Sequence, residues 1–221
     1  MNQSSENMPI IRRFGWLGIL ASLSVGLGEF LIHFSPTGFE GPSFQWLRNV
    51  PDCRISTGHF LVVFGVPFYV FGYWHLYLLL RPGSKRLAEA VLSLGIFAFI
   101  IGGMWVSSRA MLAQIVKTGD AGLLAYYDGH YEILVQFLRI IVLALSIAFA
   151  WAVWRGGTLY PKWMAFFAPI LPLAVVFLSY VFIPALGRFL VPTAMNVAHL
   201  ALFTASLYAV SGNSKSDASR V

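Results

Sequence analysis

Six long runs of apolar residues dominate the chain, each bounded by charged or turn-forming residues. They lie at about 14–34, 58–80, 88–115, 131–154, 163–183 and 193–210. A helix of about 20 apolar residues crosses the roughly 30 Å hydrocarbon core of a bilayer. Backbone groups in lipid must be satisfied within such a segment, which favours helices, and the runs lack the alternation of a β-barrel strand. The pattern therefore predicts an all-α polytopic membrane protein, with six transmembrane helices in a single domain over 1–211.

The segments between the runs predict loops of different kinds. The stretch 35–57 is the longest and is rich in proline, glycine and aromatic residues, which is typical of a lid or a packed cap. The last residues, 212–221, are small and polar and predict a disordered tail. Pro67 is expected to bend the second helix, and Pro169 and Pro172 the fifth.

Composition confirms that lipid is the main solvent of this chain. Of the 221 residues, 58% are hydrophobic and 11% are charged, whereas an ordinary soluble domain has roughly 25% charged residues. The net charge of +6 is spread over loops and ends without a basic run, so nucleic acid is not an expected partner. Cys53 is the only cysteine, which excludes an internal disulfide, a cysteine-based zinc site and an iron–sulfur cluster.

Lysine and arginine are unequally distributed between the two sets of loops. If the first helix starts in the cytoplasm, the inner segments hold most of them, and the outer loops hold Arg48, Arg54, Lys117 and Arg188. The inner set is Arg12, Arg13, Arg81, Lys85, Arg86, Arg155, Lys162, Lys215 and Arg220. Because cytoplasmic loops carry the excess of positive charge, both termini are predicted to be cytoplasmic.

Polar side chains within the spans fall at similar depth. Glu29 and His33, in "VGLGEFLIHF", are one helical turn apart and leave the same face of the first helix. The outer halves of the other helices hold His59, Arg109, His130, Glu132, Gln136, Arg139, Asn196 and His199. A charge facing lipid costs roughly 2.5–3.5 kcal/mol on insertion scales, so these groups are expected to turn inward and to form a polar pocket that opens outward. Glu29 is expected to pair with Arg109 or Arg139, and His75 to be an interfacial anchor.

Three chemistries fit such a pocket. Acid–base catalysis on a lipophilic isoprenoid, sterol-like or acyl-lipid substrate is the favoured one, with four catalytic candidates and six binding candidates. The catalytic candidates are Glu29, His33, Glu132 and His199; the binding candidates are His59, Arg109, His130, Gln136, Arg139 and Asn196. The second is a metal or haem site, but the ligands are dispersed over several helices, so no bound metal and no cofactor are expected.

The third chemistry is transport, or an accessory membrane function, in place of catalysis. Six helices without a visible repeat are few for a self-contained carrier, and a homodimer would supply the missing half. A structural interpretation also stays open: Arg109 and Arg139 as ion-pair partners of Glu29 and Glu132, and His33 and His59 as interfacial residues.

A sequence resemblance adds a family context. The first half of the chain contains G-x-W-H-x-Y at Gly72–Tyr77, then Arg81-Pro82-Gly83, then the glycine pair Gly102-Gly103. This order resembles a group of small bacterial integral membrane proteins of unknown function, which tend to have a small residue and an acid where this chain has "GEFLIHF". The resemblance implies a protein of the bacterial inner membrane, and it implies no activity and no catalytic residues.

Overall fold

The structure is a computed structural model that describes residues 8–36 and 44–218, with side chains described as far as residue 211. The described part of the chain contains helices and their connections and no strand. Part of the predicted loop 35–57, residues 37–43, lies outside the described residues.

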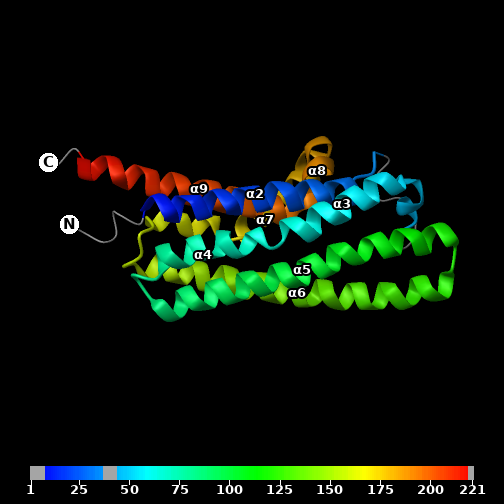
Figure 1. The fold of residues 1–221 in the computed structure, drawn as a ribbon, viewed down its shortest axis with the longest axis horizontal. Coiled ribbons are helices and arrows are strands. Elements are labelled where there is room, and N and C mark those ends of the chain that lie inside the picture. The colour runs from blue at the N-terminus through cyan, green and yellow to red at the C-terminus, as the bar shows by residue number, and fades with distance from the viewer. Residues whose placement is uncertain (1–7, 37–43, 219–221) are drawn as a thin grey trace.

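Long helices lie side by side along one axis (Figure 1). The α-helices are α2 (Met8–His33), α3 (Asp52–Gly65), α4 (Phe68–Leu80), α5 (Lys85–Thr118), α6 (Ala121–Arg155), α7 (Ile170–Phe182), α8 (Pro184–Leu190) and α9 (Ala194–Ala218). Short 3-10 helices are η1 (Gln45–Asn49), η2 (Lys162–Phe167) and η3 (Val191–Thr193). The end of the bundle where α2 begins and α9 ends is called the terminal end below, and the end where α5 meets α6 is called the distal end (Figure 1).

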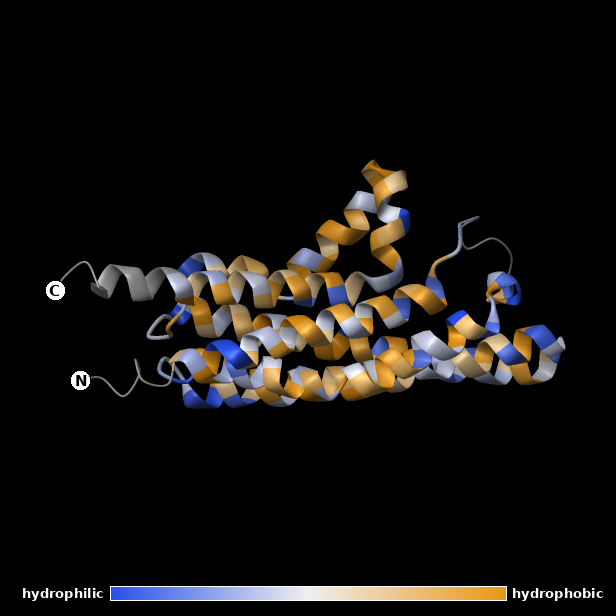
Figure 2. Ribbon diagram, turned by 45° about the horizontal axis from the view of Figure 1, so that its top comes forward, coloured by the Kyte–Doolittle hydropathy of each residue, from blue (hydrophilic) through white to orange (hydrophobic). Residues whose placement is uncertain are grey.

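Five segments of the described chain are long and apolar enough to cross a membrane, which indicates an integral membrane protein. They are Met8–His33, Asp52–Leu80, Lys85–Thr118, Ala121–Arg155 and Pro184–Ser211. Hydrophobic residues dominate the middle of the bundle, and hydrophilic residues gather toward its two ends (Figure 2). The second segment is interrupted between α3 and α4 at Val66 and Pro67, where a bend was predicted.

The predicted span at 163–183 is not one long helix. It divides into η2 and the 13-residue α7, and 13 helical residues extend only about 20 Å, less than the hydrocarbon core. Pro169 precedes α7 and Pro172 lies in its first turn, so the helix begins where two backbone N–H groups are missing. The run at 163–183 is hydrophobic as predicted, but the structure divides it where one continuous helix was expected.

Helices α7 and α8 form a short hairpin that projects from the side of the bundle (Figures 1 and 2). The hairpin is tight because Gly187 of α8 packs directly on the backbone of Tyr180 of α7, where a Cβ would overlap. Its tip is strongly apolar and exposed, with Phe182 76% accessible. Helix α9 continues to Ala218, so it includes residues 212–218 of the segment that was predicted to be a disordered tail.

The two longest helices, α5 and α6, are delimited by capping residues. The hydroxyl of Ser84 accepts a hydrogen bond from Leu87 N at the start of α5, and the carboxylate of Asp120 accepts one from Leu123 N at the start of α6. Between them Gly119 has φ 79°, the left-handed conformation that ends a helix. Gly119 and Asp120 thus form a two-residue turn, after which α6 runs antiparallel to α5 (Figure 1).

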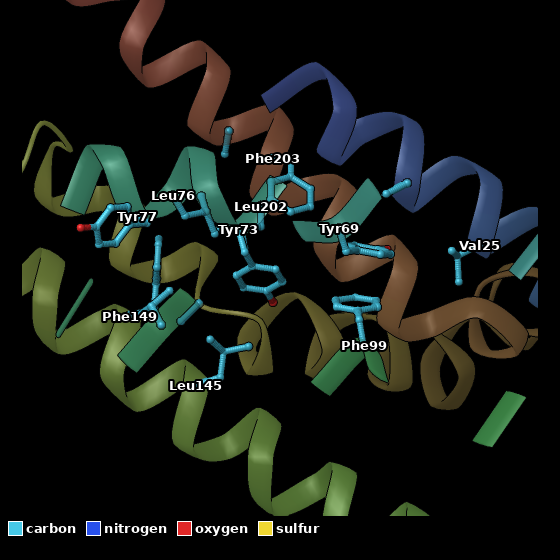
Figure 3. Packing of buried hydrophobic residues seen from close by; sticks show 14 of the residues in the cluster. Val25, Tyr69, Tyr73, Leu76, Tyr77, Phe99, Leu145, Phe149, Leu202 and Phe203 are labelled. Atoms are coloured by element: carbon cyan, nitrogen blue, oxygen red, sulfur yellow. The ribbon is translucent and has the colours of Figure 1, made fainter. Parts of the chain in front are cut away.

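Close helix packing sets the position of the polar interior. A Cβ on Gly28 of α2 would lie 2.6 Å from the carbonyl oxygen of Gly58 of α3, so only glycine permits this approach. Deeper in the bundle the ring of Tyr69 stacks on that of Phe99, with 14° between their planes (Figure 3). The tight contact of α2 with α3 places the next residue, Glu29, in the interior.

Candidate functional site

A buried ion pair lies at the centre of the polar interior. Nη1 of Arg109 on α5 lies 3.1 Å from Oε1 of Glu29 on α2. The two residues are 1% and 5% exposed, respectively. A buried charge is tolerated only when it is paired and hydrogen-bonded. Of the two partners that depth allowed for Glu29, the structure places Arg109 beside it.

The second carboxylate oxygen of Glu29 is bonded by α9. Nδ2 of Asn196 donates to Oε2 of Glu29 at 2.8 Å, and Oδ1 of Asn196 accepts from the hydroxyl of Tyr69 at 2.7 Å. The Tyr69 oxygen also lies 3.2 Å from Oγ of Ser22, whose hydroxyl donates to the Gly18 carbonyl. Both carboxylate oxygens are therefore held, and the amide of Asn196 is oriented by a bond at each end.

Arg109 is positioned by aromatic residues on its other sides. Its Nε donates to the hydroxyl of Tyr131 at 2.8 Å, and its guanidinium carbon lies 4.0 Å from the ring centre of Trp105, one turn away on α5. Within this group of side chains, Nη2 of Arg109 and Nε1 of Trp105 are buried and have no hydrogen-bond partner among the described residues. The ion pair therefore leaves unused donors beside it.

A small cavity of about 30 Å³ adjoins this network. Its polar wall is made by Glu29, Asn196 and Trp105, and the remaining wall is apolar or glycine. The other lining residues are Val25, Val66, Ala98, Phe99, Gly102, Gly103, Val106, Leu138 and Met195. Of these, Val66, Gly102, Gly103 and Met195 are only partly buried, so the wall that they form reaches the bundle surface.

His199 extends the polar interior by one further turn of α9. Its Nδ1 bonds the Met195 carbonyl at 2.8 Å, and since a carbonyl only accepts, Nδ1 carries the proton. Nε2 of the neutral ring then accepts from the hydroxyl of Tyr73, 2.6 Å away. His199 is fully buried and makes an edge-on contact with Phe99, so both its nitrogens are engaged within the protein.

A second polar cluster lies nearer the terminal end. Nδ1 of His75 donates to the Ile11 carbonyl at 2.7 Å, and Nε2 lies 2.7 Å from Oγ of Ser206, which in turn bonds the Tyr160 hydroxyl. His75 and Ser206 are both 0% exposed. The prediction that His75 is an interfacial anchor is wrong, because its ring joins α2, α4 and α9 in the core.

The polar residues predicted on α6 do not enter the interior. Glu132, Gln136 and Arg139 form one exposed stripe, in which Gln136 donates to Glu132 at 2.6 Å and Arg139 lies 3.7 Å from the same carboxylate. His130 is also exposed and bonds the Tyr126 carbonyl. The expectation that this stripe faces inward is therefore corrected.

The exposed stripe lies at the same level of the bundle as the buried ion pair. Glu132 lies about 16 Å from the distal start of α6 at 1.5 Å per residue. Its neighbour Tyr131 bonds Arg109, so the stripe and the ion pair differ in the direction that their side chains face and not in their depth. The rotation of α6 about its axis therefore turns Glu132, Gln136 and Arg139 to the outside of the bundle.

The predicted histidines of α2 and α3 lie at the distal edge of the site. His33 is half-buried and stacks on Trp46 of η1, with ring centres 5.1 Å apart. His59 is half-buried beside Phe60, and its Nδ1 has no partner among the described residues. In the part of the chain that the structure describes, no three His, Cys, Asp or Glu side chains are grouped to hold a metal ion.

Of the ten predicted site residues, the structure connects three in the interior, Glu29, Arg109 and Asn196, and a separate three on the exposed face of α6, Glu132, Gln136 and Arg139. A family model described as "Family of unknown function (DUF6796)" matches residues 1–212. The chain belongs to this family. No curated protein is significantly similar to it, and no solved structure is either.

The site of this DUF6796 member also contains residues that the sequence analysis did not select. Tyr69, Tyr73 and Tyr131 each bond a predicted polar residue, as described above. Tyrosine is common in membrane helices as an interfacial or packing residue, so its presence gave no signal. The spacing of Tyr69 and Tyr73 by one turn, opposite Asn196 and His199 with nearly the same spacing, was the available clue.

Proposed function

We propose that this protein is a membrane-embedded binding protein that takes a lipophilic small molecule from the bilayer into the cavity beside Glu29. The observation that carries the proposal is the cavity wall. This wall consists mostly of apolar residues but includes the carboxylate of Glu29 and the amide of Asn196, which hold each other in place by a hydrogen bond. A fixed polar group is therefore available to a molecule that is otherwise surrounded by apolar side chains. Small-molecule sites typically have such mostly apolar walls with a few fixed polar groups.

The position of the cavity favours entry from the membrane. Gly103 of α5 faces Val66, in the break between α3 and α4, and among the described residues a Cβ on the neighbouring Gly102 would meet only Leu138 of α6, at 3.9 Å. Because the two glycines have no side chains and the α3–α4 segment is interrupted, an apolar chain would enter between this break, α5 and α6. A lipophilic molecule would then keep its apolar part against lipid-like surroundings throughout entry.

Filling the cavity tests the proposal. Gly102→Leu adds a side chain at the cavity wall, whereas Gly129→Leu adds the same side chain on α6 where no atom lies within 4 Å of the new Cβ. Protein purified in mild detergent is extracted with organic solvent, and the retained molecules are quantified by mass spectrometry. We expect one lipophilic species near one per chain in the wild type and in Gly129→Leu, and its loss in Gly102→Leu. Equal retention in all three proteins would contradict the proposal.

Acid–base catalysis in the same cavity is the second candidate, and one observation favours it: the carboxylate of Glu29 forms part of the wall. A carboxylate there can take a proton from a bound molecule or return one. Retention of a different but related molecule by Glu29→Gln, consistent with an unreacted substrate, supports catalysis. Retention of the same molecule by both proteins supports binding alone.

We also propose a location and orientation for the protein. The excess of lysine and arginine at the terminal end favours a cytoplasmic location for the start of α2 and the end of α9, and the resemblance of the first half supports the bacterial inner membrane. In this orientation the chain passes outward through η2 and α7, a further crossing that is not a single helix, and returns through α8, η3 and α9. The cavity then lies in the outer half of the membrane.

A further inference from the structure

We infer that the molecule held in the cavity is uncharged and presents a carbonyl oxygen to Trp105 and Arg109. This inference rests on the proposed binding function and adds the chemical class of the ligand. It is carried by two unpartnered donors, by the charge balance of the site and by the size of the cavity.

The two donors belong to side chains that stack on each other, and one of the two side chains lines the cavity. Nε1 of Trp105 and Nη2 of Arg109 are both buried and both without an acceptor among the described residues. Trp105 lines the cavity, and the Arg109 guanidinium lies 4.0 Å from its ring centre. Buried N–H groups in folded proteins nearly always have an acceptor. A carbonyl oxygen has two lone pairs and can accept from either donor or from both.

The charge balance excludes an ionised ligand. The single positive charge of Arg109 is matched by the carboxylate of Glu29, and the neighbouring groups Asn196, Tyr69 and Tyr131 are neutral donors and acceptors. A carboxylate on the ligand would compete with Glu29 for the same guanidinium and leave one buried negative charge without a partner. An ammonium group would face Arg109. A neutral acceptor avoids both costs.

The cavity size limits what can enter it. A volume of about 30 Å³ exceeds the roughly 10–15 Å³ that one water needs by this measure but is far too small for a whole lipid. It therefore accommodates the polar end of a molecule, whose apolar part must lie along Val66, Gly102 and Leu138 toward the bundle surface. Quinones, long-chain ketones and acyl esters share this arrangement of one carbonyl and an apolar body.

The test compares matched probes of one chain length. Binding of 2-tridecanone, tridecane and tridecanoate to protein in lipid nanodiscs is measured by competition with a fluorescent apolar probe. One hydrogen bond contributes about 0.5–1.5 kcal/mol, so we expect the ketone to bind about 2–10-fold more tightly than the alkane, and the carboxylate no more tightly than the alkane. A decyl-quinone and a methyl ester, tested separately, distinguish the two natural sources of the carbonyl.

Variants assign the preference to the donor. Trp105→Phe removes the indole N–H and keeps an aromatic ring; it should reduce the preference for ketone over alkane, because Nη2 of Arg109 is then the one donor of the two that is left. Trp163→Phe, outside the cavity, should leave the preference unchanged.

Three outcomes would contradict the inference or its basis. If the wild type binds ketone and alkane equally tightly, and Gly102→Leu binds neither, the carbonyl inference is overturned but the binding function is intact. Saturable binding of none of the probes, with no effect of Gly102→Leu on retained molecules, would overturn the binding function itself. Tightest binding by tridecanoate would overturn the neutral ligand.

Discussion

Glu29 and Arg109 are 80 residues apart in the chain, yet their side chains meet in the interior at 3.1 Å. Among the described residues, Glu29 is the only carboxylate that is bonded to Arg109, and Arg109 is the only cation that is bonded to Glu29. The pair therefore joins α2 to α5, and the bonds of Asn196 and Tyr131 extend the junction to α9 and α6. Four helices are thus connected through two charged side chains.

Removal of one charge should be much more harmful than removal of both. Glu29→Gln and Arg109→Gln each leave a buried charge without its partner, which typically costs about 3–5 kcal/mol. The double variant should lose less than the sum of the two single variants. The free energy of unfolding in mixed micelles measures both effects, and strictly additive losses would contradict direct pairing.

The exposed pair on α6 supplies a matched control. Glu132 and Arg139 have the same charges, but their side chains are 58% and 65% exposed and lie 3.7 Å apart. Glu132→Gln and Arg139→Gln should each change the unfolding free energy by less than about 1 kcal/mol, because water and salt screen such pairs. Comparable losses for the buried and the exposed pair would show that burial is not the cause.

The contrast between these two pairs shows what the sequence could and could not predict. Spacing from the helix start gave the depth of Glu29, and depth limited its partner to Arg109 or Arg139. Depth does not give the rotation of a helix about its axis, and in the structure Glu132 and Arg139 face the outside of the bundle. The sequence therefore predicted that an inward ion pair exists, but only packing selected its second member.

The fold, too, could be predicted from the sequence only in part. Hydropathy gave an all-helical membrane bundle because each long apolar run must satisfy its own backbone groups. It did not give the division of 163–183 into η2 and α7, because hydropathy is insensitive to the missing N–H groups of Pro169 and Pro172. The polar roles of Tyr69 and Tyr73 could not be predicted for another reason. A tyrosine hydroxyl joins a hydrogen-bond network only when packing brings an acceptor on another helix within reach, and the sequence does not give this packing.

The hydroxyl of Tyr69 should contribute measurably to stability. Tyr69→Phe removes the donor to Asn196 and leaves its Oδ1 without that bond, at a cost of about 1–3 kcal/mol. Tyr208→Phe, on a side chain that is 73% exposed, should change stability by less than about 0.5 kcal/mol. Thermal unfolding of the two variants in the same detergent makes the comparison, and an unchanged midpoint for Tyr69→Phe would contradict the described network.

The single cysteine provides a direct test of orientation. Cys53 is exposed at the start of α3, toward the distal end. If the terminal end is cytoplasmic, a membrane-impermeant maleimide should label Cys53 in intact cells. The charge asymmetry between the two sets of loops is the physical reason.

A cysteine moved to the other end controls for access. In Cys53→Ser combined with Lys85→Cys, the thiol lies at the start of α5, where the native side chain is 67% exposed. This protein should react only after the cells are permeabilised. Labelling of Lys85→Cys but not of Cys53 in intact cells would reverse the proposed orientation and move the cavity to the cytoplasmic half.

An experimental density map of the wild-type protein in lipid nanodiscs, at a resolution that shows side chains, tests the binding of a lipophilic molecule most directly. We expect an elongated density that enters between Val66 and Leu138, passes Gly102, and ends within hydrogen-bond distance of Nε1 of Trp105, beside the Glu29–Arg109 pair. A cavity that contains only rounded, water-sized density, or that is closed by the side chains of its own wall, would contradict the proposed binding function.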